Sequence, residues 1–333
     1  MHSERDIARD VLSQKGSFLA VSLTSFLAPK MTSQRRASRP FRKLQRCTIA
    51  GVAVDSVSLE DASRLIIEEL RQRSTATPFL IMGANAQLVT LAQQDTRLFD
   101  ALHASALNVP DGISVVLASR CLGGKIPIRV PGGELMESLC SKAARHGLSV
   151  LLLGGLPEAA ALASRHLQKR YPALSVAGTY CPPRGFERDP MERAHIRQMI
   201  AEAAPDILFV AFGAPKQEIW MHENCHTLPI GAAMSVGAAF DTQSGLRKRA
   251  PRWTHKLGIE WLYRLVQEPR RLWRRYLIGN TYFIYLVLKQ RFLYGRSKLS
   301  KTAIASPQST PQSIGRSASF EPVRDPVKVE SQA

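Results

Sequence analysis

The amino-acid sequence predicts an α/β protein with a mostly parallel sheet that is covered by helices. Apolar segments of strand length alternate with helix-length segments from about residue 47 to residue 246. Segments such as 148–155 (LSVLLLGG) are continuously apolar, which is typical of strands buried on both faces of a parallel sheet. Glycines and polar residues directly follow these segments, and ligands of such sheets bind beyond the carboxyl ends of the strands.

The elements follow one another in a regular order. The first predicted strand is CTIAGVAV at 47–54, and a helix is predicted from Ser58 to Arg73. The other predicted strands cover 78–83, 106–110, 148–155, 174–180, 206–213 and the first part of 228–240. The other predicted helices cover 85–104, 132–146, 157–171, 190–203 and 215–226. Strands that are joined by helices run parallel, so their carboxyl ends meet at one edge of the sheet.

The composition divides the chain into four parts. We expect a disordered basic leader over 1–46, an α/β core over 47–246, a helical, membrane-associating appendage over 247–296 and a disordered tail over 297–333. The appendage is rich in Trp and Arg, and the tail is rich in Ser, Pro and Gln. Residues 16–28 resemble the apolar part of a signal peptide, but Ser and Thr interrupt them, so a leader or a start at Met31 is preferred.

The positive charge lies on the two flanks of the core. The net charge is +18; residues 1–46 contain ten Lys and Arg against three acidic residues, and 247–301 contain fifteen against two. Such flanks suit an anionic membrane surface, nucleic acid or simple solvation. No nucleic-acid recognition motif is present, so nucleic acid is not an expected partner. The uncharged segment 276–288 is too short to span a bilayer.

The stretch HENCH matches the H-E-x-x-H pattern of zinc peptidases. On a helix, His222 and His226 would lie on one face as zinc ligands, with Glu223 as a general base. The third ligand would be His255 or Glu260, but both lie in a strongly basic segment that disfavours a dication. Both His also come near the C-terminal end of the predicted helix, where a cationic side chain is favourable without a metal. We therefore expect no metal site.

Glycine-containing loops follow three of the predicted strands. Gly154 and Gly155 precede a helix, an arrangement that lets a phosphate approach the backbone and the positive end of the helix. The pattern is not G-x-G-x-x-G, so a nicotinamide dinucleotide is not expected, and a tight turn is the alternative. FGAPKQE and SVGAAFD add polar residues at the same edge of the sheet. The nucleotide-binding candidates are Gly154, Gly155, Gly213, Gln217, Glu218, Gly237 and Asp241.

Two polar residues follow the first strands of the core. Asp111 comes directly after ALNVP, where a carboxylate faces the ligand edge of the sheet and suits a general base. A turn or a helix N-cap is the alternative role for this Asp. Asn85 holds the equivalent position after the preceding strand, with helix capping as its alternative.

Three arginines in the basic appendage have helical spacing. Arg264, Arg271 and Arg274 would fall within about 80° of arc on one helix, although Pro269 intervenes and could split it. Three guanidiniums could bind a pyrophosphate, and a solvated basic face is the alternative. The sequence has no D-x-D motif, so a nucleotide diphosphate would be stabilised by Arg or helix dipoles instead of a metal ion.

The order of these motifs resembles the WecG/TagA/CpsF family, which is glycosyltransferase family 26. The resemblance covers roughly residues 47–278, and GAPKQE and IEWLYRL..EP are its most specific segments. Further matching segments are GVAVDSVSLEDA, GANAQLVTLAQQD, ALNVPDGISVV, RVPGGELM, VLLLGG and SVGAAFDTQSGLRKRAP.

The resemblance implies an inverting, metal-independent transferase with a Rossmann-like core of the GT-E arrangement and no cofactor. Such enzymes move a sugar from a UDP-sugar, such as UDP-ManNAc, UDP-ManNAcA or UDP-glucose, to a polyprenyl-diphosphate-linked saccharide. They act at the cytoplasmic face of the plasma membrane in the synthesis of cell-surface or exopolysaccharides. The resemblance implies that Asp111 is the catalytic base, that Asn85 lies in the pocket, and that Arg264, Arg271 and Arg274 bind the diphosphate.

One position departs from the family pattern. A pocket Thr of some members, two residues before the Asn, is Gly83 in this sequence. This departure leaves open a non-catalytic relative that acts as a membrane-bound partner in polysaccharide assembly. A homo-oligomer is compatible with the sequence, which does not define the oligomeric state.

Overall fold

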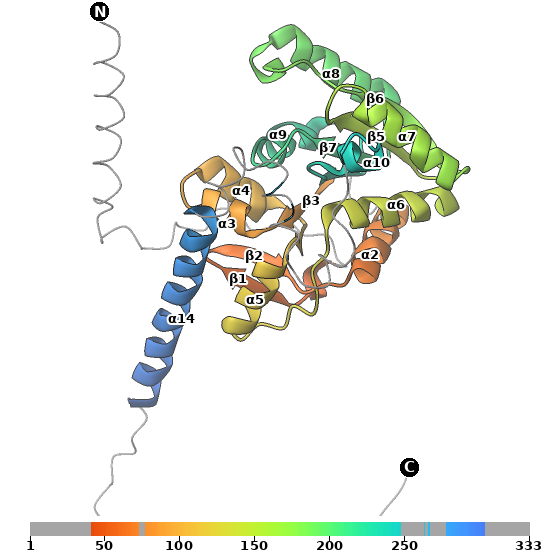
Figure 1. Cartoon of the computed structure of the whole chain (residues 1–333). Coiled ribbons are helices and arrows are strands. Elements are labelled where there is room, and N and C mark those ends of the chain that lie inside the picture. Colours follow the sequence, from red (N-terminus) through yellow and green to blue (C-terminus); the bar gives the residue numbers. More distant parts are fainter. Residues whose placement is uncertain (1–40, 73–76, 248–262, 264–265, 267–277, 304–333) are drawn as a thin grey trace, which may run out of the picture. The chain divides into compact units, whose positions relative to one another are not determined.

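The structure of the protein is a computed structural model that describes residues 41–72, 77–247, 263, 266 and 278–303 (Figure 1). Residues 1–40 of the predicted leader, and Arg264, Arg271 and Arg274, lie outside these residues, whereas 41–46 are described and Phe41 is buried. By its internal contacts, the chain up to Arg291 forms one compact unit.

Six parallel strands form the central sheet, in the order β4-β3-β8-β7-β5-β6. The strands are β3 (Phe79–Ala84), β4 (Leu107–Pro110), β5 (Ser149–Gly154), β6 (Ser175–Tyr180), β7 (Ile207–Ala211) and β8 (Ala232–Ser235). The predicted parallel α/β class is therefore confirmed. Every strand of the sheet pairs parallel to its neighbours, so the carboxyl ends of all six strands point the same way.

Helices cover both faces of this sheet (Figure 1). One face packs against α2 (Leu59–Gln72), α6 (Gly132–His146), α7 (Ala159–Arg170) and α10 (Ala239–Gln243). The other face packs against α3 (Ala86–Leu91), α4 (Thr96–Ala104), α5 (Ile113–Cys121), α8 (Pro190–Ala203) and α9 (Lys216–Asn224). Alternate residues of each strand enter the two cores, and Val150 and Leu152 lie in the first while Leu151 and Leu153 lie in the second. This double burial explains the continuously apolar strand sequences.

The prediction of a single strand over 47–54 is wrong. This segment forms an antiparallel hairpin of β1 (Arg46–Ile49) and β2 (Val52–Asp55), which is separate from the main sheet. The two-residue turn places Ala50 at φ +46° and Gly51 at φ +83°. Glycine adopts positive φ readily, and the Ala-Gly pair in the middle of the apolar run was the signal for the turn.

The predicted helix over 85–104 is divided, and two short helices were not predicted. α3 ends at Leu91, and Asp95 caps α4 by accepting hydrogen bonds from Arg97 N and Leu98 N, at 3.0 and 3.4 Å. The two helices that were not predicted are α5, which comes after β4, and α10, which comes after β8. The remaining helical turns are η1 (Phe41–Lys43), η2 (Phe186–Arg188) and η3 (Cys225–Thr227).

The first half of α14 (Asn280–Ala303) packs against the β1–β2 hairpin. Phe283 and Val287 are buried in the same core as the hairpin. The side chain of Gln290 accepts a hydrogen bond from Ala50 N at 2.7 Å and donates one to Thr48 O at 2.8 Å. Residues 240 positions apart in the chain are thus joined at the hairpin turn. Within the described residues, no helix combines the length and the apolarity that a membrane span requires.

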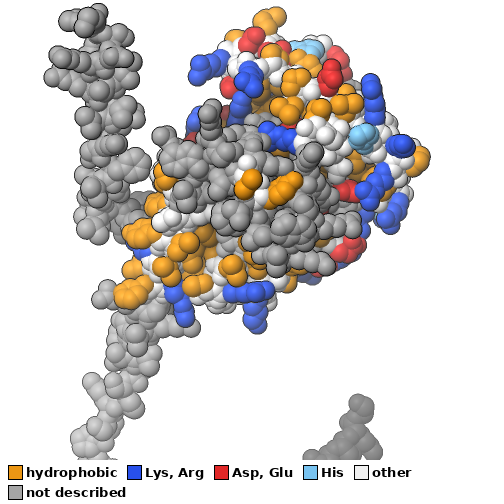
Figure 2. All heavy atoms as spheres, viewed as in Figure 1, with side chains coloured by type: hydrophobic (Ala, Val, Ile, Leu, Met, Phe, Trp, Pro, Cys, Tyr) orange, Lys and Arg blue, Asp and Glu red, His pale blue; other side chains and the backbone are white. Residues whose placement is uncertain are grey.

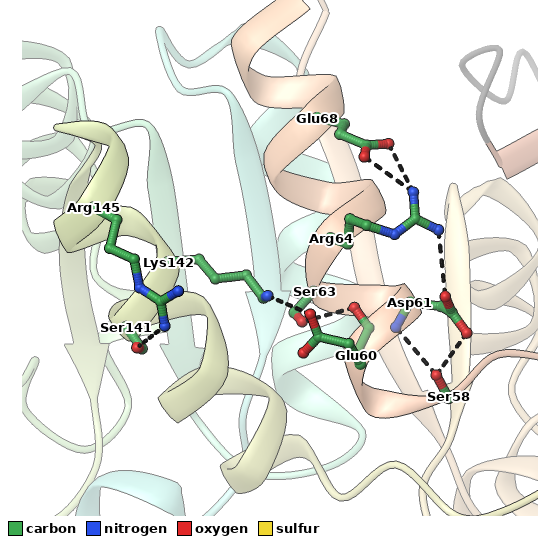
Figure 3. A network of polar contacts seen from close by, with 9 residues as sticks. All are labelled: Ser58, Glu60, Asp61, Ser63, Arg64, Glu68, Ser141, Lys142 and Arg145. Atoms are coloured by element: carbon green, nitrogen blue, oxygen red, sulfur yellow. Dashed lines mark hydrogen bonds and ion pairs between the residues drawn. The ribbon is translucent and has the colours of Figure 1, made fainter.

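A polar network joins α2 and α6 (Figure 3). Lys142 of α6 donates to Glu60 of α2 at 2.6 Å, and Ser58 precedes α2 and donates to Asp61 at 2.7 Å. Arg64 continues the network along α2 to Glu68, at 3.0 Å. Only the bond from Lys142 to Glu60 joins the two helices among these contacts, and exposed ion pairs of this kind contribute little free energy individually.

Candidate active site

The loops after the strands bring the predicted site residues to the carboxyl edge of the sheet. Ala84 and Pro110 are paired in register at the ends of β3 and β4, so the residues that follow them, Asn85 and Asp111, leave the sheet side by side. Gly154 pairs with Ala211 in the same way. The candidates from separate parts of the sequence therefore share one edge, as the parallel topology predicted.

The backbone positions Asp111 at the end of β4. Its N–H donates to Ala84 O at 2.8 Å, which continues the ladder one residue beyond the strand. Gly112 follows with φ +135°, a conformation that favours glycine, and α5 begins at Ile113. The chain therefore turns sharply after Asp111, and this residue is not a side-chain cap of α5.

Buried polar residues hold β4 in place beneath Asp111. Asn108 donates to Ala53 O at 2.9 Å and to Leu102 O at 2.8 Å, and it accepts a hydrogen bond from Ser105 Oγ at 2.7 Å. The buried carboxylate of Asp55 accepts a hydrogen bond from Asn108 N at 2.7 Å. A fully bonded buried network of this kind favours one conformation of the backbone. The hairpin thus supports the strand that carries the candidate base.

Asn85 caps α3. Its Oδ1 accepts a hydrogen bond from Leu88 N at 3.0 Å, so the capping alternative is observed. Gln87 lies in the same first turn, and its buried Oε1 has no hydrogen-bond partner among the described residues. The participation of Asn85 in ligand binding stays a prediction.

Gln217 joins the loops that follow β7 and β8. Its Oε1 accepts hydrogen bonds from Gly213 N and Gly237 N, both at 3.2 Å. Its Nε2 donates to Oε1 of Glu218 at 2.7 Å. Gly213 and Gly237 have φ values of +80° and +56°, which glycine adopts most readily. One buried amide therefore fixes two glycine loops at the ligand edge.

Glu218 is a buried carboxyl group beside the site. Its side chain is 1% exposed, and Oε2 has no hydrogen-bond partner among the described residues. Burial raises the pKa of Glu218, and the Asp111 carboxylate raises it further, while Gln217 and Ser235 oppose the shift. The letters GAPKQE marked this residue, but its burial could not be derived from them.

Gly154 and Gly155 form a tight turn between β5 and α7. A Cβ on Gly154 would lie 2.8 Å from Ala211 O, and Gly155 N donates to that same oxygen at 2.9 Å. Asp241 ties this turn to α10, because its Oδ1 accepts a hydrogen bond from Leu156 N at 3.0 Å. The close approach of β5 and β7 therefore explains why position 154 is a glycine. That Gly154, Gly155 and Asp241 contact a nucleotide stays a prediction.

The HENCH residues have local roles in the structure. His222 and Glu223 lie on α9, which ends at Asn224, and His226 belongs to η3. Nδ1 of His226 is 3.1 Å from His222 O. In the described residues, no three His, Cys, Asp or Glu side chains are grouped as ligands for a metal ion. His255 and Glu260 lie outside the described residues.

A cavity of about 550 Å³ lies away from these residues, between α2, α6 and α7. Its cations already have partners in the structure. Lys142 donates to Glu60, and Arg145 donates to Ser141 at 3.2 Å (Figure 3). Arg170 pairs with Glu137. Because the charges of Lys142 and Arg170 are already paired with carboxylates, this cavity is a poorer candidate than the carboxyl edge of the sheet.

The sheet and the loops at its carboxyl edge define a Rossmann-like α/β protein with a candidate ligand site beyond the strands. The model of the glycosyl transferase WecG/TagA/CpsF family matches residues 47–297. The chain belongs to this family of glycosyl transferases.

Three similar proteins carry the name N-acetylglucosaminyldiphosphoundecaprenol N-acetyl-beta-D-mannosaminyltransferase. The protein of Bacillus subtilis (strain 168) is 32% identical over 64% of this chain and 80% of its own. The protein of Bacillus spizizenii (strain ATCC 23059 / NRRL B-14472 / W23) is 33% identical over 71% of this chain and 88% of its own. The protein of Staphylococcus aureus (strain MW2) is 30% identical over 73% and 92%, respectively.

Proposed function

We propose that the protein transfers a sugar from a UDP-sugar to a polyprenyl-diphosphate-linked saccharide, with inversion and without a metal ion. Its relatives, which are named for transfer of N-acetylmannosamine to N-acetylglucosaminyldiphosphoundecaprenol, favour that donor sugar and that acceptor. One observation carries the proposal. In a chain that belongs to this glycosyl transferase family, Asp111 directly follows β4 at the carboxyl edge of the sheet, where ligands bind.

The proposed reaction uses Asp111 as the general base. The carboxylate accepts the proton of an acceptor hydroxyl while that oxygen attacks the anomeric carbon of the donor. The bond between this carbon and the diphosphate oxygen breaks, and its electron pair leaves with UDP. Attack opposite the leaving group inverts the anomeric configuration. The glycine loops after β5, β7 and β8 are the proposed surroundings of the nucleotide, with Gln217 and Asp241 fixing their shape.

Negative charge develops on the leaving diphosphate. We propose that Arg264, Arg271 and Arg274 stabilise it, since guanidinium groups bind diphosphate oxygens in pairs. This role would join the basic appendage to the active site. The lipid-linked acceptor also accounts for the proposed location at the cytoplasmic face of the plasma membrane, where the basic flanks would meet anionic lipids.

Thermal unfolding with a panel of nucleotides tests the proposal. A ligand that binds only the folded protein raises the melting temperature. We expect UDP and one or more UDP-sugars to raise it, and AMP and NAD to leave it unchanged. A non-catalytic partner in polysaccharide assembly is the second candidate, because Gly83 replaces a Thr of some family members. That candidate predicts no turnover of any UDP-sugar, even with the lipid-linked acceptor present.

A further inference from the structure

The outer face of α5 and the loop that follows it expose apolar side chains next to the candidate base. Ile113 and Leu117 are one helical turn apart on α5 and are 38% and 54% exposed. Val115 and Val116 are buried in the core on the inner side of the same helix. α5 is therefore apolar on both sides, although among the described residues only its inner side is buried in the core.

The loop after α5 adds to this surface by returning to the start of the helix. Gly124 N donates to Ser119 O at 2.8 Å, and Val130 N donates to Pro110 O at 2.7 Å. Ile128 lies two residues before the second of these bonds and is 57% exposed. We name Ile113, Leu117 and Ile128 the α5 surface. It begins two residues after Asp111.

The charged residues of the segment that carries the α5 surface are all basic, and Asp111 and Glu134 flank this segment. Residues 112–133 contain Arg120, Lys125 and Arg129 and no acidic residue. Arg120 and Lys125 are exposed. Figure 2 shows hydrophobic side chains gathered where α5 and the hairpin lie, with Lys and Arg beside them. Exposed apolar side chains with a basic border suit the interface of an anionic bilayer, which offers both acyl chains and negative headgroups.

We propose that the α5 surface inserts into the headgroup region of an anionic membrane and so presents Asp111 to the lipid-linked acceptor. The choice of a membrane rests on the proposed function, because the acceptor's diphosphate lies at the bilayer surface. α5 packs on β1, and α14 is hydrogen-bonded to the turn of the same hairpin through Gln290. α14 also carries the exposed apolar residues Ile284 and Leu288. Docking through α5 is proposed in addition to docking through the appendage predicted over 247–296, to which Ile284 and Leu288 belong.

The test compares Leu117→Asp and Ile128→Asp with Met191→Asp in the full chain. Met191 is an 80% exposed apolar residue on α8 and is the matched control. Each variant is sedimented with vesicles of phosphatidylcholine that contain phosphatidylglycerol, and folding is checked by its melting temperature. We expect the first two changes to weaken vesicle binding about tenfold and the control to bind like the unchanged protein. Arg120→Glu with Lys125→Glu should weaken binding to these vesicles and not to vesicles of phosphatidylcholine alone.

Three results would overturn the proposal. The first is vesicle binding by Leu117→Asp that equals binding by Met191→Asp. The second is absence of vesicle binding by the unchanged protein. The third is that Leu117→Asp converts an oligomer to a monomer while vesicle binding stays unchanged. This result would show that the α5 surface is a contact between copies of the chain. Turnover of a short-chain, water-soluble acceptor separates this inference from the proposed function. The Leu117→Asp variant should retain this turnover, because the acceptor needs no membrane. If neither the unchanged protein nor any variant shows turnover, the proposed transferase activity is rejected, and the vesicle-binding result still decides the membrane proposal.

Discussion

Gly83 leaves the space that the Asp111 side chain occupies. A Cβ placed on Gly83 would lie 3.1 Å from Cβ of Asp111 and 3.2 Å from its Oδ2. These separations are shorter than ordinary van der Waals contacts, so a side chain at position 83 requires the Asp111 side chain or its neighbours to shift by a few tenths of an ångström. The residue at position 83, which is a Thr in some family members, is therefore in direct contact range of the proposed base.

Gly83→Ala should lower turnover about tenfold, because a displacement of a few tenths of an ångström misaligns the base with the acceptor hydroxyl. Gly178→Ala is the matched control in β6, where the new Cβ would meet Leu151 Cδ1 at an ordinary 3.5 Å. Initial rates at saturating substrates measure the effect. Equal rates for the two variants would show that Asp111 tolerates the added methyl group.

Asp111→Asn should lower turnover about 100-fold or more, in the range for loss of a general base. The amide keeps the shape of the carboxylate, and the bond from the residue's backbone N–H to Ala84 O remains, so the melting temperature should change little. Near-normal turnover by the purified variant would reject the assignment of Asp111 as the base.

Gln217→Ala should destabilise the protein by about 2 kcal/mol, because it leaves Gly213 N, Gly237 N and Glu218 Oε1 without their partner. Gln198→Ala is the control, since Gln198 makes only an exposed contact with Glu202 on α8. Urea denaturation measures both. If the two variants unfold at the same urea concentration, the Gln217 bridge does not stabilise the loops.

Glu218→Gln should change how stability depends on pH. The pKa of Glu218 is raised above its ordinary value of 4.5, chiefly by burial. The folded protein then keeps a proton that the unfolded chain releases, so this group lowers stability as pH rises from about 4.5 through the raised pKa. The Gln variant lacks this loss. Its free energy of unfolding, relative to the unchanged protein, should rise across that window and then level off. A pH-independent difference would contradict the buried, protonatable state of Glu218.

Transfer should persist in EDTA, because the sequence has no D-x-D motif and the proposed mechanism places the diphosphate charge on arginines. The measurement is UDP release before and after dialysis against the chelator. Loss of activity that Mn²⁺ restores would reject metal-independent transfer.

The sequence predicted the parallel sheet well because its strands carry a strong and simple signal. The segments 150–153 and 207–210 are continuously apolar, and each is buried by helices on both faces. The hairpin was missed because its turn at Ala50 and Gly51 lies inside an apolar run that is long enough for one strand. α5 was missed because it carries apolar residues on both its inner and its outer face, which obscures helical periodicity.

The candidate site was only partly predictable, because sheet topology places some of its residues and side-chain packing places the others. Parallel topology alone brings Asn85 and Asp111 together at adjacent strand ends. The bridge from Gln217 to two glycine loops and the burial of Glu218 depend on side-chain packing between β7 and β8, which no spacing in the sequence encodes. The same holds for the space that Gly83 leaves for Asp111.

The most direct test of the transferase assignment is the anomeric configuration of the product. The full chain would be incubated with UDP-N-acetylmannosamine and a short-chain lipid diphosphate that carries N-acetylglucosamine, and the product would be analysed by nuclear magnetic resonance. We predict one UDP released for each disaccharide formed, a new linkage of configuration opposite to the donor's, and almost no product with Asp111→Asn. A linkage that retains the donor's configuration, or equal product formation by the Asp111→Asn variant, would contradict the account.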